Sequence, residues 1–416
     1  MKRKTTPDSK IKPEFPGKPS VMHEANRMKR LPLYLFTIID DLKAKAAARG
    51  VDVIDLGMGN PDLPTPPHIV EALHNAAKKV ENQRYSRPKG DVERRFKQAI
   101  AKWYHQRFGV ELDAEREVLP LIGSKEGIAH LSLAFLNNDD IGLIPSPAYP
   151  VHFNGVIMAG GILVSLPLSA EHDYKPVFKP LSKEITRMAK LMLVGYPHNP
   201  TTATVDLDFY REWVDWGKSK EIIMASDLAY SDIVFDGYTA PSLLQVPGAK
   251  ELPCIEFHTC SKSYNMAGWR VGWVAGNAEI LASLEKTKSY IDFGIFRAVQ
   301  EAAIAALTGP QSCVKEGVEI YRKRRDLFVE GLKKIGWEVA KPKATFYIWA
   351  HVPPKFSALS SLEFVQLLVE EAGVVVAPGT GFGEYGEGFV RFALVEPEER
   401  LKTALERIGK VLNISG

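Results

Sequence analysis

Between about residues 50 and 300 the sequence alternates helix-like segments with short apolar runs, and this alternation constrains the fold most strongly. Five of the runs are mostly apolar on both faces: residues 118–122, 141–144, 191–194, 222–225 and 271–275. Strands that are buried between two layers of helices have this composition. Strands that alternate with helices predict a mainly parallel sheet, which binds its ligands at the carboxyl ends of the strands. The predicted fold class is therefore α/β.

Two helices are predicted before the first of these strands. Thr65, followed by two prolines, is typical of an N-cap with proline in the first turn, and apolar residues then recur at helical spacing as far as Val80. A second helical pattern covers residues 92–103, and Gly109 is expected to end that helix.

The pattern changes after about residue 313. The expected order is a charged helix through 321–325, a strand over 345–352, a helix from Ser361, strands near 374–377 and 389–395, and a last helix from about Pro397. This mixture of elements predicts a smaller α+β domain.

Charge and composition argue against several classes of protein. The 53 basic and 50 acidic residues leave a formal net charge of +3, which argues against a large nucleic-acid-binding field. Residues 1–19 carry six Lys and Arg residues but no apolar run, so we expect a mobile or partner-embracing arm and no signal peptide. No segment approaches the roughly 20 apolar residues that cross a bilayer. The three cysteines have neither zinc-site spacing nor an even count, so the reducing cytoplasm is the expected compartment.

The most informative segment is Ser261-Lys-Ser-Tyr-Asn-Met-Ala-Gly-Trp-Arg270. A lone lysine is usually a solvated surface residue. Lys262, however, follows a strand-like run and precedes a stretch without other charges, where a lysine can lose its proton and attack an aldehyde. Arg270 and Ser261 suit the recognition of a phosphate. A lysine nucleophile beside a phosphate clamp is what an aldehyde cofactor with a phosphate group requires.

This segment resembles the pyridoxal-phosphate (PLP) attachment signature of class I/II aminotransferases. The resemblance to this family extends over nearly the whole chain, roughly residues 30 to 412. It implies the fold-type I, aspartate aminotransferase-like architecture: a large PLP-binding domain with a mainly parallel mixed sheet between helices, plus the smaller α+β domain. We expect an N-terminal arm over residues 1–30, the large domain over 67–312, and the small domain from 31–66 and 313–416.

Asp227 ends the apolar run 222–226, where a carboxylate can face a ligand, although taken alone such a residue is more often a loop cap. The resemblance implies that Asp227 pairs with the pyridine nitrogen of PLP and keeps the ring protonated. It also implies that Tyr230 and Asn199 bind the phenolic oxygen of the cofactor. The bond before Pro200 is a candidate cis peptide by the same resemblance.

Ser124 and Lys125 follow a predicted strand and open a helix, where free N–H groups and the helix dipole favour phosphate. By itself the pattern also fits a simple N-cap at Ser124. The resemblance implies that both residues bind the phosphate, mainly through backbone amides. It implies that Ser261 and Arg270 share this task, and that Tyr149 stacks on the cofactor ring.

Arg391 lies among apolar neighbours in a predicted strand, where a charge needs a partner. The resemblance implies that Arg391 grips the α-carboxylate of the substrate and that backbone at Gly59 approaches the same group. It adds Asn199 and Tyr34 to the substrate contacts.

Tyr85 resembles a tyrosine that reaches the phosphate from the neighbouring subunit, which implies a homodimer with shared active sites. Related sequences tend to have an uncharged residue where this chain has Arg297. We hypothesise that Arg297 contributes to recognising a second acidic or polar group of the substrate; the alternative is a surface or interface arginine.

The implied activity is transamination between an L-amino acid and a 2-oxo acid, with Lys262, Asp227 and Tyr230 as catalytic residues. The motifs look most like bacterial glutamate–pyruvate (alanine) aminotransferases, which predicts alanine and 2-oxoglutarate as substrates. The first alternative activity is that of an LL-diaminopimelate aminotransferase. The second alternative is that of a PLP-dependent carbon–sulfur lyase. A ligand-sensing regulator would need a DNA-binding module, for which the segment before Leu31 is too short.

Overall fold

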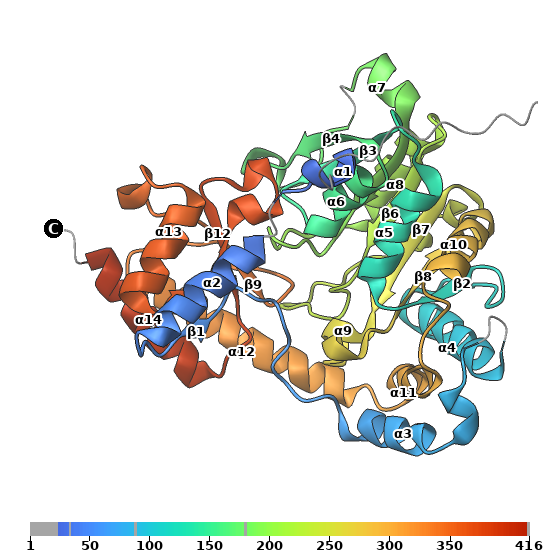
Figure 1. Cartoon of the computed structure of the whole chain (residues 1–416), viewed down its shortest axis with the longest axis horizontal. Coiled ribbons are helices and arrows are strands. Elements are labelled where there is room, and N and C mark those ends of the chain that lie inside the picture. Colours follow the sequence, from blue (N-terminus) through green and yellow to red (C-terminus); the bar gives the residue numbers. More distant parts are fainter. Residues whose placement is uncertain (1–23, 33–34, 87–89, 179–180, 414–416) are drawn as a thin grey trace, which may run out of the picture.

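A computed structural model describes residues 24–32, 35–86, 90–178 and 181–413 of the chain. Its main feature is a seven-stranded sheet (Figure 1). The strands run across the sheet in the order β2 (Val118–Leu121), β8 (Gly272–Gly276), β7 (Cys254–Thr259), β6 (Ile223–Asp227), β5 (Ala189–Val194), β3 (Ile141–Ser146) and β4 (Ile162–Pro167). β8 is antiparallel to both of its neighbours, and the other pairs are parallel. The predicted mainly parallel mixed sheet is confirmed.

The helices that accompany this sheet are α3 (Pro67–Ala77), α4 (Asp91–Phe108), α5 (Ser124–Phe135), α6 (Pro150–Met158), α7 (Lys183–Met188), α8 (Leu207–Lys218), α9 (Cys260–Ser263), α10 (Ala278–Ile291) and α11 (Arg297–Thr308). Alternate strand residues pack on opposite layers, as the two-residue period of a strand requires. In β5, Leu191 and Leu193 join the core under α5, α6 and α10, while Met192 and Val194 join the core under α8. The sheet is therefore buried on both faces.

The remaining elements form a smaller group around a second hydrophobic core (Figure 1). Its helices are α2 (Leu35–Ala48), α12 (Ser312–Lys334), α13 (Ser361–Leu367) and α14 (Glu398–Asn413). Its strands are β1 (Ile54–Asp55), β9 (Tyr347–His351), β10 (Val374–Val375), β11 (Ala377–Pro378) and β12 (Phe389–Ala393). β11, β12 and β9 form an antiparallel sheet, and β1 pairs with β10 in parallel. The short helix α1 (Asn26–Lys29) lies near α6. None of the helices in the described part of the chain combines the length and apolarity that a membrane span requires.

Two details differ from the sequence predictions. Thr65 is not the N-cap: α3 begins one residue later, with Pro66 in that position, and the Thr65 hydroxyl donates to the carbonyl of Asn265 (2.7 Å). Val80 lies beyond α3 in a 3₁₀ turn and is exposed, so it does not extend the apolar face of the helix. By contrast, Gly109 ends α4 as predicted, in the left-handed conformation (φ 68°) that favours glycine.

Candidate active site

One pocket contains eleven of the residues that the sequence predicts for the site. They are Gly59, Ser124, Lys125, Tyr149, Asn199, Asp227, Tyr230, Ser261, Lys262, Arg270 and Arg391. Most follow the carboxyl ends of β2, β3, β5, β6 and β7, where the turns of a parallel sheet meet at one edge. Arg391 reaches the pocket from β12 of the smaller group.

Lys262 lies in α9, directly after β7, and its partly buried ammonium donates to the carbonyl of Gly59 (2.9 Å). Loss of solvent lowers the pKa of Lys262 to about 8, and the nearby charges of Arg391 and Arg270 contribute to this lowering, against the opposing effect of Asp227. A lysine with this pKa is about one tenth free amine at pH 7, far more than an ordinary lysine, and the free amine is the form that attacks a carbonyl.

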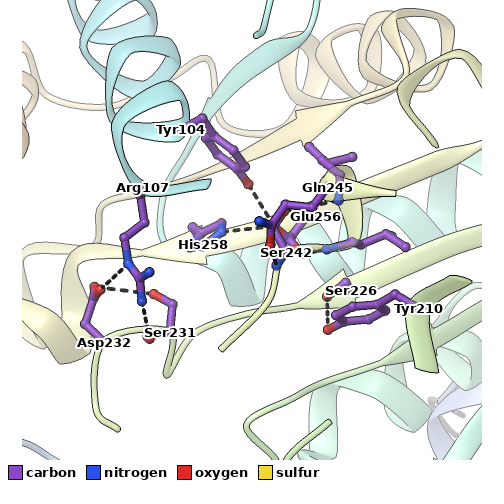
Figure 2. A network of polar contacts seen from close by, with 12 residues as sticks. Tyr104, Arg107, Tyr210, Ser226, Ser231, Asp232, Ser242, Gln245, Glu256 and His258 are labelled. Atoms are coloured by element: carbon purple, nitrogen blue, oxygen red, sulfur yellow. Dashed lines mark hydrogen bonds and ion pairs between the residues drawn. The ribbon is translucent and has the colours of Figure 1, made fainter. Parts of the chain in front are cut away.

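A buried network holds the strand that leads to Lys262 (Figure 2). Glu256 of β7 has no exposed surface. Its carboxylate accepts hydrogen bonds from the hydroxyls of Tyr104 (3.2 Å) and Ser242 (2.6 Å) and from the backbone N–H of Leu243 (2.8 Å). His258 Nε2 lies 3.3 Å from the same carboxylate. Because several donors compensate the buried charge, the network ties β7 to α4 and to the 3₁₀ turn after Ser242.

Asp227 lines the pocket, and its two carboxylate oxygens have different surroundings. Its Oδ2 lies 3.0 Å from Nε2 of His152, which donates because an ionised carboxylate can only accept. Its Oδ1 is buried and has no hydrogen-bond partner among the described residues. An unpaired buried carboxylate oxygen is costly, so this atom fits a protonated ring nitrogen such as that of PLP.

Two cations meet at the N-terminus of α5. Lys125 lies in the first turn, and its pKa is lowered by burial and by the charge of Arg270. Gly123 precedes the helix with φ 75°, a conformation that favours glycine, and a Cβ there would lie 2.5 Å from Nη2 of Arg270 and would displace that guanidinium. Two mutually repelling cations at a helix N-terminus would be stabilised by an anion such as a phosphate, which the helix dipole also favours. Ser124 is the first helical residue and makes no cap, so the interpretation as a simple N-cap is wrong.

Arg391 lines the pocket, and its guanidinium lies over two aromatic rings that also line it. It donates to Oδ1 of Asn199 (2.7 Å) and to the carbonyl of Gly57 (2.7 Å), and its Cζ lies 4.1 Å from the ring centre of Tyr347 and 4.6 Å from that of Phe382. It forms no ion pair with any carboxylate of the described residues. Since a buried charge needs a partner, this arginine is suited to a carboxylate that a ligand supplies.

Ten of the residues that line the pocket were not predicted, and three of them bear on its chemistry: His152, Tyr347 and Phe382. His152 could have been suspected, because it follows the predicted Tyr149 by three residues in what becomes the first turn of α6. Nothing in the local sequence of β9 marks Tyr347, because only the folded chain brings its hydroxyl within 2.7 Å of the hydroxyl of Tyr230.

Two other predicted residues, Tyr85 and Arg297, do not line this pocket. Tyr85 is 82% exposed. The guanidinium of Arg297 donates to the backbone carbonyls of Glu81 (2.7 Å) and Tyr85 (2.8 Å), and within one chain it does not line the Lys262 pocket. Its proposed contact with substrate stays a hypothesis. Tyr34 lies outside the described residues.

The backbone also matches one prediction that rests on the resemblance. The Asn199–Pro200 bond is cis, as are the Ser146–Pro147 and Tyr196–Pro197 bonds.

Comparison with known proteins identifies the family. Residues 51–408 match the family model described as aminotransferase class I and II. An LL-diaminopimelate aminotransferase of Moorella thermoacetica is 48% identical over 391 residues, which cover 94% of this chain and 99% of the relative. The glutamate–pyruvate aminotransferase AlaC of Escherichia coli is 46% identical over 390 residues, 94% of each chain.

A solved structure supports the same assignment. A probable N-succinyldiaminopimelate aminotransferase from Thermus thermophilus superimposes with a TM-score of 0.85 at 39% identity, covering 91% of this chain and all of the other. The chain therefore belongs to the class I and II aminotransferase family.

Proposed function

We propose that this aminotransferase uses PLP bound to Lys262 and takes LL-diaminopimelate as its amino donor. The observation that carries the cofactor assignment is the arrangement around one amine. Lys262, with its lowered pKa, lies in one pocket with a cationic phosphate cradle and with the unpaired Oδ1 of Asp227. When bound, PLP would supply an electron sink for the charge that develops at the α-carbon.

The chain's own residues would divide the remaining tasks. Asp227 would hold the ring nitrogen protonated, and Arg391 would orient the α-carboxylate of the substrate. Tyr230 and Asn199 would bind the phenolic oxygen, and Tyr149 would stack on the ring. The free amine of Lys262 would take the α-proton and return it as general base and acid.

The proposed amino donor differs from the one that the sequence motifs predict. The motifs alone favoured alanine, but relatives named LL-diaminopimelate aminotransferase, including the one from Moorella thermoacetica, support LL-diaminopimelate better. The similarity to AlaC of Escherichia coli keeps alanine with 2-oxoglutarate as the second candidate.

We also infer that a second copy of the chain covers an apolar patch around the end of α10. The patch, defined by Tyr85, Tyr290, Ile291, Phe293 and Phe296, consists of large exposed side chains. Contiguous exposed apolar surface of this kind typically marks an interface. A homodimer would place Tyr85 where it can reach the phosphate site of the partner subunit.

Two further assignments stay proposals. Domain boundaries near residues 66 and 312 are supported by the starts of α3 at Pro67 and α12 at Ser312; most of the proposed arm over residues 1–30 lies outside the described residues. A cytoplasmic location is supported by Cys254, Cys260 and Cys313, which are all free thiols.

An absorbance spectrum of the PLP-loaded protein tests donor and cofactor together. Alanine, glutamate and LL-diaminopimelate are added separately, without an oxo acid. Loss of the yellow lysine-bound form with LL-diaminopimelate, and gain of the pyridoxamine form, would support the proposal. Bleaching by alanine and glutamate alone would select the second candidate. Release of ammonia from a cysteine conjugate without any oxo-acid acceptor would select the lyase.

A further inference from the structure

Tyr347 of β9 is a buried residue that lines the pocket. It is 2% exposed, and its hydroxyl oxygen lies 2.7 Å from that of Tyr230, which is 5% exposed. Within the described residues the two hydroxyls satisfy each other, since neither side chain makes another hydrogen bond there.

The ring of Tyr347 supports the arginine of the pocket. In the antiparallel pair of β9 and β12, Tyr347 lies opposite Ala393, so Arg391 is its diagonal neighbour on the same face. The Cζ of Arg391 lies 4.1 Å from the ring centre of Tyr347. A guanidinium at this distance is attracted by the face of the ring and fixed in orientation.

The hydroxyl of Tyr347 also lies close to the backbone of Gly59, whose carbonyl accepts a hydrogen bond from Lys262. A Cβ added to Gly59 would lie 1.9 Å from the Tyr347 oxygen, and the carbonyl of Gly59 accepts the hydrogen bond of Lys262. The ring of Tyr347 is buried and contacts Arg391 and Phe346, so it has little freedom to yield. The absence of a side chain at Gly59 therefore makes space for the Tyr347 hydroxyl, in addition to allowing the expected approach of a substrate carboxylate to the backbone.

We propose that Tyr347 is a positioning residue that joins carboxylate binding at Arg391 to the hydrogen bond that Tyr230 gives the cofactor. The hydroxyl of Tyr347 donates to Tyr230, which leaves the Tyr230 proton free to point at the phenolic oxygen of PLP. Hydrogen bonds in such a chain polarise one another in a low-dielectric site, so the first bond makes Tyr230 a better donor. This role rests on the proposed PLP site.

The chemistry gives the direction of the expected effect. A donor at the phenolic oxygen stabilises its anion and weakens its hold on the proton of the Schiff base with Lys262. Loss of the Tyr347 hydroxyl should therefore raise the pKa at which the spectrum of the bound cofactor changes, in the same direction as loss of the Tyr230 hydroxyl and by less.

The test compares Tyr347→Phe, Tyr347→Leu, Tyr230→Phe and the double variant of Tyr347→Phe with Tyr230→Phe. Tyr321→Phe is the matched control, because Tyr321 is equally buried and contacts Phe346, yet its hydroxyl has no partner among the described residues. Each PLP-loaded protein is titrated by absorbance, and kcat and KM are measured with one donor.

We expect Tyr347→Phe to raise the spectral pKa and to lower kcat about threefold to tenfold at nearly constant KM, since the ring still supports Arg391. Tyr347→Leu should raise KM as well. The double variant should titrate like Tyr230→Phe alone, and Tyr321→Phe like the parent. An unchanged titration in Tyr347→Phe, or additive shifts in the double variant, would overturn the role of Tyr347. Absence of lysine-bound PLP in the parent would instead remove the proposed function itself.

Discussion

The guanidinium of Arg297 donates to the backbone carbonyl of Tyr85 over 2.8 Å and, with its other terminal nitrogen, to that of Glu81 over 2.7 Å. The buried side chain of Gln300, one turn further along α11, donates to the hydroxyl of Ser86 (2.9 Å). Two residues of α11 thus fasten the segment that carries the exposed Tyr85 ring. If Tyr85 contacts the phosphate in the partner subunit's site, Arg297 affects cofactor binding indirectly, because it holds the backbone that carries Tyr85.

Substitution of Arg297 by Gln should therefore weaken PLP binding rather than change substrate choice. The loss of two exposed hydrogen bonds from a charged group should raise the Kd of PLP about threefold to tenfold. Equilibrium dialysis of PLP measures this, with Arg94→Gln as control, since the Arg94 side chain pairs at the surface with Asp91 and with no other carboxylate of the described residues. Unchanged PLP affinity together with a raised KM for dicarboxylic donors would instead support direct recognition of substrate by Arg297.

Asp227→Asn should bind PLP but transaminate poorly. The amide cannot balance a protonated ring nitrogen, so kcat should fall at least about a hundredfold, the factor that corresponds to losing a buried charge partner. Stopped-flow absorbance of the half-reaction measures the loss. The same substitution at Asp206, which caps α8 by accepting from the N–H of Phe209, should leave kcat near that of the parent. Equal kcat in the two variants would contradict the assignment of Asp227.

The rate at which the apoprotein captures PLP should rise with pH through about 8 and then level off, because the free amine of Lys262 is the nucleophile. Rapid mixing across a pH series measures this rate. A rate that keeps rising toward the ordinary lysine pKa of 10.5 would show that Lys262 is not desolvated as described.

The same pKa has a consequence for the stability of the apoprotein. Between about pH 8 and 10.5 the unfolded chain binds the Lys262 proton more tightly than the native protein does. The contribution of this group to the free energy of unfolding therefore increases with pH across that window. Lys262→Met should abolish this contribution, which denaturant titrations at the two ends of the window can measure.

Glu256→Ala should destabilise the protein without removing the PLP site. The substitution leaves the buried donors of Tyr104, Ser242 and Leu243 without their acceptor, which should cost about 2–4 kcal/mol in the free energy of unfolding. Urea unfolding measures the loss. The control is Glu279→Ala, because Glu279 is an exposed residue in the first turn of α10. It should lower the free energy of unfolding by less than about 1 kcal/mol, since surface substitutions usually change this quantity by only about 0.5 kcal/mol. Equal losses in both variants would contradict the importance of the network.

The sequence predicts the central sheet well because burial on both faces leaves a direct mark in composition. Leu193 and Val194 pack on opposite layers, so both must be apolar, and such runs can be recognised without a structure. β4 was not predicted: it is an edge strand, its residues are mostly half-buried, and polar Ser165 interrupts it. β2, at the other edge of the sheet, is buried along its whole length and was predicted, so incomplete burial, and not the edge position itself, weakens the signal of β4.

The site residues also fall into two groups: those that the local sequence marks and those that only the folded chain brings together. Lys262 and Arg270 could be found because they lie in one contiguous segment, and Asp227 because it ends an apolar strand. The contact of Tyr347 with Tyr230 joins positions 117 residues apart, and that of His152 with Asp227 joins positions 75 apart. Such pairs depend on how the smaller group of elements packs against the sheet and on the crossovers between strands, and a single sequence carries no signal for either.

The most direct test of the central claim is to locate the lysine that binds PLP. The PLP-loaded protein is reduced with borohydride, digested, and mapped by mass spectrometry, with Lys125→Met and Lys262→Met treated alongside. If Lys262 binds PLP, one modified peptide is expected, labelled at Lys262 in the parent and in Lys125→Met and unlabelled in Lys262→Met. Stoichiometric label on another lysine in the parent, or undiminished label in Lys262→Met, would contradict it.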